Sequence, residues 1–175
     1  MKEALRTLLL ACLVSLDASA LVAQTLPRIE ATALDNHKVV IPNPRRFKAI
    51  VLVLGFSHKS ADRCEGWEKR LSQDFSAQPN IGYFEVPELQ GVPGLVKPMI
   101  LHGMRHQIPP AEQSHFVPIY QHEEELKNIV GFTDEQDAYL IVAAPDGRVV
   151  WHDKGTITEA KYAELKRAVS SVLAQ

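Results

Sequence analysis

An unbroken apolar run in the first third of the chain constrains the fold more than any other feature. Residues 49–56 read Ala-Ile-Val-Leu-Val-Leu-Gly-Phe, without a single polar side chain. Hydrophobicity that is continuous rather than alternating is typical of a strand buried on both faces of a sheet. The run therefore predicts a central strand.

The hydrophobic period changes directly after this run. Cys64, Trp67, Leu71 and Phe75 recur at helical spacing with charged residues between them, which predicts a helix over 59–75. Similar patterns predict a β-hairpin over 29–41, strands at 81–86, 138–143 and 148–151, a short extended piece at 116–120, and helices over 93–107, 123–130 and after residue 158. Thr158 is expected to cap the last helix, whose apolar face is Tyr162, Leu165, Val169 and Val172.

Composition excludes several classes of protein. The 175 residues are 46% hydrophobic with a formal net charge of −2, which is enough apolar material for a core and argues against disorder and against a nucleic-acid binder. Two cysteines are too few for a disulfide scaffold or a cysteine-only zinc site. We expect no nucleic-acid partner and no cofactor.

The first residues have the pattern of a secretory signal. Lys2 and Arg6 precede the apolar stretch 8–14, and Ala18-Ser19-Ala20 fits signal peptidase. We predict a signal peptide at 1–20, with cleavage after residue 23 as the alternative, followed by one domain at 27–175. The protein is then periplasmic or extracellular, without a stable membrane span. An uncleaved signal, or lipidation of Cys12, would instead anchor it to the membrane.

The order of the predicted elements, a parallel βαβ half followed by an antiparallel ββα half, resembles the thioredoxin plan. The strand ending at Phe56 leads into Ser57-His58-Lys59-Ser60 and a helix, where thioredoxins place Cys-x-x-Cys. The resemblance implies a three-layer α/β sandwich: a central mixed sheet with an N-terminal β-hairpin extension.

A narrower resemblance is to the mitochondrial ATP synthase assembly-factor family, which chaperones the proton-channel subunit. Three segments of this sequence show the similarity: Phe-Ser-His-Lys-Ser at 56–60 followed by Trp67, the stretch 96–109 that ends Arg-His-Gln-Ile-Pro, and the closing strand pair Tyr139 to Trp151. This similarity implies a role as an assembly factor or chaperone whose redox motif has been lost.

The residues at the redox position argue against dithiol chemistry. Thiol–disulfide exchange needs an attacking thiolate and a resolving thiol, and Ser57 and Ser60 supply neither. Loop 133–137 also lacks the proline that thioredoxins place before the next strand. We expect no catalytic residue here. Ser57 and Ser60 are expected to cap the helix. The candidate binding position is the segment Ser57, His58, Lys59 and Ser60.

Cys64 and the segment 95–108 leave alternatives open. Cys64 either packs in the core, acts as a reactive thiol, or binds a metal. Met99, His102, Met104 and Arg105 form a candidate docking segment, with sheet coverage as the alternative. Arg105 is either an anchor for the partner or an internal contact that holds loop 109–116.

The leading function is protein binding by an exported, redox-inactive assembly factor or chaperone. One alternative is a thiol-dependent peroxidase or oxidoreductase that uses Cys64. The other is a periplasmic metal-binding module, because His102 and His106 stand at i, i+4 spacing and would project from one face of a helix.

Overall fold

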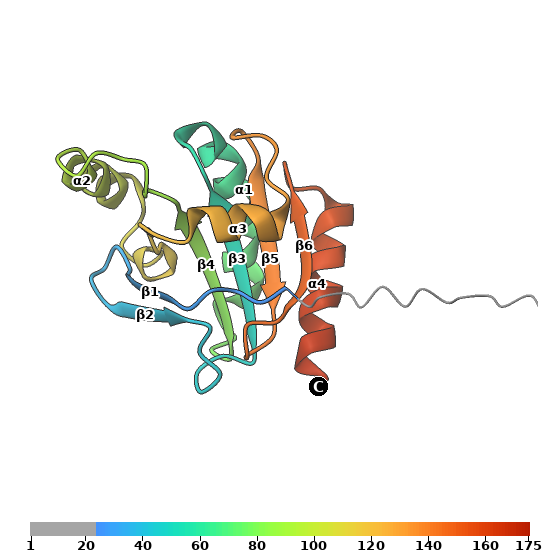
Figure 1. Cartoon of the computed structure of the whole chain (residues 1–175). Helices are drawn as coiled ribbons and strands as arrows, with labels where there is room; N and C mark the ends of the chain where they lie inside the picture. Colours follow the sequence, from blue (N-terminus) through green and yellow to red (C-terminus); the bar gives the residue numbers. More distant parts are fainter. Residues whose placement is uncertain (1–23) are drawn as a thin grey trace, which may run out of the picture.

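The computed structural model describes residues 24–175 (Figure 1). In it, the predicted central strand is an inner strand of a four-stranded sheet. Strand β3 (Ala49–Gly55) is buried along its whole length. It pairs in parallel with β4 (Ile81–Pro87) and antiparallel with β5 (Ala138–Ala143), and β6 (Val149–Lys154) pairs antiparallel with β5. The strand order is β4-β3-β5-β6, so the expected mixed sheet is confirmed.

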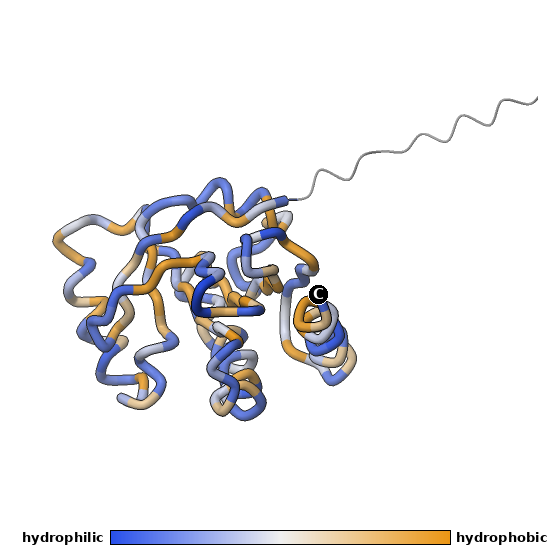
Figure 2. Tube along the Cα trace, turned by 90° about the horizontal axis from the view of Figure 1, so that it is seen from below, coloured by the Kyte–Doolittle hydropathy of each residue, from blue (hydrophilic) through white to orange (hydrophobic). Residues whose placement is uncertain are grey.

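Helices and a hairpin cover the two faces of this sheet and make three layers. Helices α1 (Ala61–Phe75) and α4 (Glu159–Leu173) cover one face. The other face carries α3 (Glu123–Val130) and the hairpin of β1 (Ile29–Thr32) and β2 (Lys38–Ile41), which is the predicted N-terminal extension. Figure 2, which colours the chain trace by hydropathy, shows hydrophobic and hydrophilic residues alternating along α4, the helix that ends at the C-terminus. Each face thus has its own apolar core.

The helical periodicity of the sequence located two buried faces correctly. Cys64, Trp67, Leu71 and Phe75 of α1 are all buried, and the predicted apolar face of α4 packs on the same side of the sheet. Thr158 accepts a hydrogen bond from the Lys161 N–H at 3.2 Å, so the predicted cap is confirmed.

Two elements between β4 and β5 differ from the prediction. The expected helix over 93–107 begins later, as α2 (Lys97–Gln107), with Pro98 in its first turn, where a missing N–H costs no helical hydrogen bond. The extended piece at 116–120 forms isolated parallel bridges, from Phe116 to Glu85 of β4 and from Ile119 to Glu88 just after β4, rather than a strand of the sheet. Two short 3₁₀ turns, His58–Ser60 before α1 and Gln113–His115, complete the described elements.

Helix α2 stands apart from the layers, at the upper left of Figure 1, and contains no buried residue. Its main link to the body is Arg105, whose Nε donates to the Leu34 carbonyl at 2.8 Å and whose terminal nitrogen donates to the Asn36 side chain at 3.2 Å. Asn36 sits in the tight turn of the hairpin with a φ of 74°. Loop 109–116 is held instead by Gln113, which donates to the Arg105 and Ile108 carbonyls.

The expected signal peptide at 1–20 lies outside the described residues, as does Cys12. Within residues 24–175, none of the helices combines the length and apolar character needed to cross a bilayer.

The contact between α2 and the hairpin predicts that Arg105→Ala lowers the free energy of unfolding by about 1 kcal/mol, because two hydrogen bonds from a charged donor are lost at a partly exposed site. Chemical denaturation measures the change. Arg167→Ala, which removes an exposed arginine on α4, is the matched control and should leave stability unchanged. Equal stability of both variants would contradict an internal role for Arg105.

Candidate functional site

A pocket of about 410 Å³ opens where β3 and β4 end, between the start of α1 and helix α2. Ser57, His58 and Ser60 of the degenerate redox position line one side, and Met104 of the candidate docking segment lines the opposite side. The structure therefore brings together two groups of residues that the sequence places more than 40 positions apart. The order of the parallel strands explains the location, because the carboxyl ends of β3 and β4 lie at the same edge of the sheet.

The two serines just before α1, Ser57 and Ser60, form hydrogen bonds within the chain. The Ser57 hydroxyl donates to the Glu135 carbonyl at 2.8 Å and accepts from the Lys59 N–H at 3.0 Å. The Ser60 hydroxyl donates to the Ser57 carbonyl at 2.8 Å. Ser57 thus caps the 3₁₀ turn, but Ser60 does not cap α1 with its side chain, because its backbone already lies in the turn conformation with φ −86° and ψ −5°.

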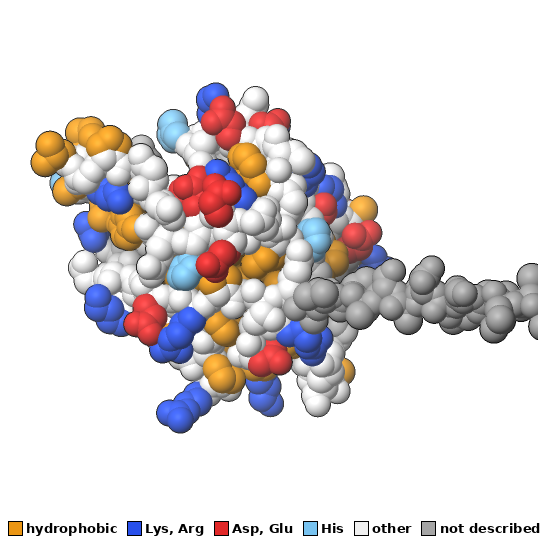
Figure 3. Space-filling model, in the orientation of Figure 1, with side chains coloured by type: hydrophobic (Ala, Val, Ile, Leu, Met, Phe, Trp, Pro, Cys, Tyr) orange, Lys and Arg blue, Asp and Glu red, His pale blue; other side chains and the backbone are white. Residues whose placement is uncertain are grey.

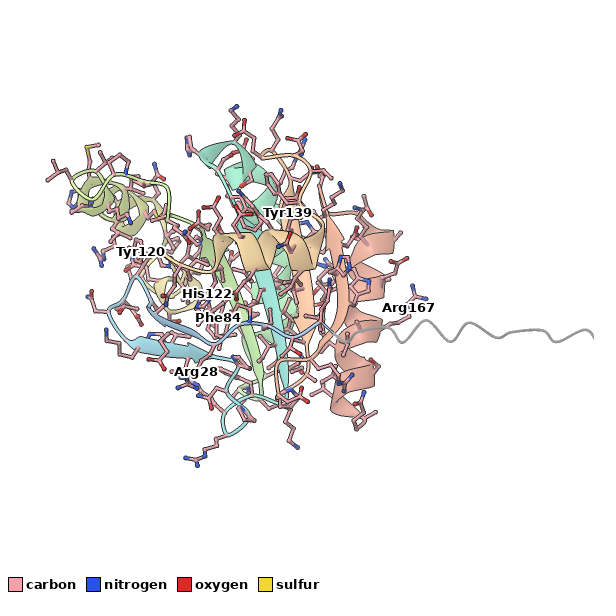
Figure 4. All side chains as sticks on the ribbon, viewed as in Figure 1. Arg28, Phe84, Tyr120, His122, Tyr139 and Arg167 are labelled. Carbon is pink, nitrogen blue, oxygen red and sulfur yellow. The ribbon has the colours of Figure 1, made fainter. Side chains whose placement is uncertain are left out.

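Charged residues at the start of α1 hold the loop before β5. Lys59 pairs with Glu135, and Arg63 pairs with Asp137. The hydrogen bond to Glu135 raises the pKa of Lys59. Tyr139, labelled beside α3 in Figure 4, accepts from the backbone N–H groups of Thr133 and Asp134 at the other end of the same loop. Ser57, Lys59 and Arg63 therefore connect the start of α1 to loop 133–137. We call this set of contacts, together with the Ser60 hydrogen bond to Ser57, the clasp.

Cys64 lies beneath this clasp with only 1% of its surface exposed. Its Sγ atom is 3.8 Å from the Leu54 carbonyl oxygen and 3.9 Å from the Ser60 hydroxyl. Burial raises the pKa of the thiol, and the neighbouring Glu85 carboxyl raises it further. A protonated, enclosed thiol is a poor nucleophile, so the geometry supports core packing over the reactive-thiol alternative.

Glu85 is a site residue that the sequence analysis missed. It lies in β4, is 9% exposed and lines the pocket, yet its Oε2 atom has no hydrogen-bond partner. Burial raises its pKa to about 8, and the charges of Glu68 and Glu65 act in the same direction. A carboxylate inside the otherwise apolar strand Ile-Gly-Tyr-Phe-Glu-Val was the signal that could have identified it.

Glu68 of α1 is a second buried acid with an unpartnered oxygen. It is 5% exposed, and its Oε1 atom makes no hydrogen bond. Burial raises its pKa to about 7, with further contributions from Glu112 and Glu65. The charge of Glu68 also raises the pKa of Glu85, so these two acids between α1 and β4 favour the neutral form.

The candidate docking segment is partly exposed and partly turned inward. Leu95 is 97% exposed and Met99 is 69% exposed, and orange side chains mark this apolar tip at the upper left of Figure 3. Met104 faces the pocket, while Arg105 is engaged with the hairpin. The loop below α2 contributes Tyr120, labelled in Figure 4, whose ring carries the Lys97 ammonium at 4.6 Å from its centroid.

The two histidines of α2 do meet, as their spacing predicted. Their Nε2 atoms are 3.0 Å apart, so one ring donates a hydrogen bond to the other. Among the residues that the structure describes, no group of three or more potential ligands converges into a metal site. Two imidazoles on an exposed helix face therefore form a polar pair, and the metal-binding module gains no further ligand from the fold.

Comparison with known proteins places the fold. No family model and no curated protein matches the chain. Among solved structures, it is similar to a Sco-family cytochrome c oxidase assembly protein, BsSco (TM-score 0.58, 11% identity, 88% of this chain and 96% of that one). It is also similar to the exposed lipoprotein thioredoxin of Streptococcus pneumoniae (TM-score 0.55, 12% identity, 81% and 98%) and to the thioredoxin domain of a thiol-disulfide oxidoreductase from Bacteroides vulgatus (TM-score 0.53, 11% identity, 84% and 96%).

The chain has a thioredoxin-like fold. The matches to the lipoprotein thioredoxin and to BsSco cover most of both chains. They agree with the predicted three-layer sandwich, whose mixed sheet the structure confirms. At 11–12% identity the likeness concerns the fold alone, so what this thioredoxin-like chain does has to be argued from its own residues.

The enclosure of Cys64 predicts that a maleimide reagent labels it only after unfolding. Every protein in this test carries Cys12→Ser, so that Cys64 is the one native thiol. The folded chain should react at least 100-fold more slowly than the chain in denaturant, since the thiol is both buried and protonated. A Cys64→Ser/Ser76→Cys variant, whose new thiol is on an exposed position, is the control and should label at once. Rapid labelling of the folded native chain would contradict the packing role.

The raised pKa of Glu85 predicts that stability falls as the pH rises. Its pKa is about 8 in the folded chain and near 4.5 in the unfolded chain, so the folded state binds more protons between those values and loses that advantage as the pH increases. From pH 5 to 8.5 the native chain should lose about 4 kcal/mol more than Glu85→Gln, whose side chain stays neutral. Thermal denaturation across this range measures both, with the exposed Glu124→Gln as control. Parallel curves for native chain and Glu85→Gln would show that Glu85 ionises freely.

Proposed function

We propose that this chain is an exported, redox-inactive thioredoxin-like protein that acts by binding another protein, as an assembly factor or chaperone. The observation that carries the proposal is the state of the redox position. Both expected thiols are serines, both hydroxyls are engaged in the clasp, and Cys64 below them is buried and protonated. No group at this position can form the mixed disulfide that exchange chemistry requires.

Helix α2 supports the binding half of the proposal. An isolated helix of 11 residues with no buried side chain gains little stability from its own hydrogen bonds, and helices of globular proteins normally bury an apolar face. Here Leu95 and Met99 are exposed beside the pocket instead. Flexible, polarisable methionine suits contacts that must adapt to a partner's surface. The exposed tip and the pocket form one continuous candidate surface, which we call the α2 surface.

The assembly-factor class rests on two independent likenesses. The short motifs at 56–60 and 96–109 resemble the mitochondrial ATP synthase assembly factors. One of the similar structures belongs to a family named for cytochrome c oxidase assembly. Export rests on the signal-like N-terminus, and an exposed lipoprotein among the similar structures is consistent with it.

Site-specific cross-linking in the native host tests the binding role. A photoreactive amino acid at Met99 of the full chain should give one discrete adduct with another protein, because this side chain is exposed on the α2 surface. The same probe at Arg167, exposed on α4, is the matched control and should give none. Leu95→Asp should reduce the Met99 adduct at least fivefold without lowering the melting temperature. A folded chain whose Met99 probe gives no adduct would refute the α2 surface.

A parallel arm of this experiment tests the loss of redox activity. The native chain should not accelerate the reduction of insulin disulfides by dithiothreitol. The Ser57→Cys/Ser60→Cys variant restores both thiols at the redox position and serves as the matched comparison for the assay. Insulin reduction by the native chain that disappears in Cys64→Ala would establish the thiol-enzyme alternative instead.

A further inference from the structure

We propose that the pocket beside α2 receives a basic side chain of the partner, with its methylene stem against the apolar wall and its cationic head at Glu85 and Glu88. The proposal rests on the proposed function, because it takes the ligand to be part of a protein. It adds the chemistry of the contact: a lysine or arginine of the partner. Three features of the pocket carry it.

The first feature is an apolar wall of suitable length. Leu89 and Val92 come from the segment after β4, and Ile100 and Met104 come from α2. A volume of about 410 Å³ is in the range of sites that enclose small ligands, and it exceeds what a bound water or ion needs. Lysine and arginine are the charged side chains that bury a long hydrocarbon stem while keeping the head group polar.

The second feature is a group of acidic side chains at the end of the pocket beside β4, which become negative when they lose their protons. Three acidic residues line the pocket: Glu85, Glu88 and Glu123. Its described lining contains no lysine or arginine, and His58 is the only lining residue there with a basic side chain. Lys127 pairs with Glu123 and so offsets the charge of that carboxylate, while Lys97 lies over the Tyr120 ring. Glu85 and Glu88 are therefore the two lining acids that form no ion pair within the described residues.

The third feature is the unsatisfied state of Glu85. Its Oε2 atom is buried without a hydrogen-bond partner, which costs free energy in the unliganded protein. An ammonium or guanidinium group at this point would supply both the missing donor and the opposite charge. Glu88, 9% exposed, already accepts from the Gln90 N–H with one oxygen, which leaves its second oxygen as a further acceptor.

An anionic ligand fits the pocket less well. The start of α1 is at its rim, and free N–H groups there would favour an anion. In this chain, however, the Lys59 N–H donates to the Ser57 hydroxyl, the Ser60 N–H donates to the Ser57 carbonyl, and the next N–H donates to the His58 carbonyl. The clasp therefore removes the donors that an anion would use.

Proton release should accompany binding. Glu85 faces Cys64, Glu65 and Glu68 of α1, and Glu88 faces Glu123 and Lys127 of α3 and Lys97 of α2. In these surroundings both glutamates have a raised pKa, so a cation binds best after they lose their protons. Affinity for the cation should increase at least threefold from pH 6 to pH 8.5.

Titration of the full chain with n-hexylammonium, followed by amide shifts in nuclear magnetic resonance spectra, tests this chemistry. Hexylammonium combines an apolar stem with a cation, and 1-hexanol and hexanoate are matched probes that keep the stem. We expect shifts at Glu85, Leu89 and Met104, with an affinity at least tenfold higher for hexylammonium than for either control. Equal affinity for hexanol and hexylammonium, or tighter binding of hexanoate, would overturn the proposal.

Variants then locate the cation. Glu85→Gln and Glu88→Gln should each weaken hexylammonium binding at least fivefold and leave hexanol binding unchanged, whereas Glu124→Gln, exposed on α3, should change neither. Having two variants keeps the test decisive if one of them unfolds. Unchanged hexylammonium affinity in the folded glutamine variants would refute the site.

The two proposals fail in distinguishable ways. If the Met99 adduct forms but hexylammonium shows no preference over hexanol, the protein-binding role stands and the basic side chain is wrong. If hexylammonium binds selectively but no adduct forms, the pocket binds cations and the protein-binding role is wrong. A partner whose adduct with Met99 is weakened at least fivefold by Glu88→Gln supports both.

Discussion

The complete burial of β3 is the constraint on which the rest of this structure depends. A strand with seven buried residues has to be covered on both faces, and its chain neighbours supply that cover: the hairpin before it and α1 after it. Because α1 must return across one face, the chain turns sharply after Gly55. A β-carbon at Gly55 would lie 3.0 Å from the Ser60 hydroxyl and 3.2 Å from the Cys64 sulfur, so the turn leaves room for little more than a hydrogen atom. The position of the pocket follows from this turn.

The clasp gives the segment between β3 and α1 a structural role in this chain. Ser57 and Ser60 satisfy the first backbone groups of the 3₁₀ turn, and Ser57, Lys59 and Arg63 fix loop 133–137. The same contacts close the site to anions and enclose Cys64. The pocket between β4 and α2 presents apolar and acidic side chains beside these contacts.

Local sequence patterns were sufficient for most of the fold but for little of the site. The buried faces of α1 and α4, the hairpin and the Thr158 cap depend on residues close in sequence, and periodicity located them. The contact of Arg105 with Leu34 and Asn36 joins positions about 70 residues apart, and no local pattern predicts it. The missing partner of Glu85 is likewise a property of the assembled layers. The prediction of a helix over 93–107 placed its start too early: α2 begins at Lys97, so Pro98 lies in the first turn of the helix rather than in its interior.

The lack of any buried residue in α2 has a consequence for motion. Moving this helix away from the body exposes almost no core surface and breaks few hydrogen bonds, so its displacement costs far less free energy than global unfolding. Ile100 and Met104 move with it, and they form one wall of the pocket. One wall of the pocket thus belongs to a helix with few contacts to the body, while Glu85 at the opposite side belongs to strand β4 of the central sheet. Side chains of different lengths can be enclosed by the same site without any change in the layers beneath it.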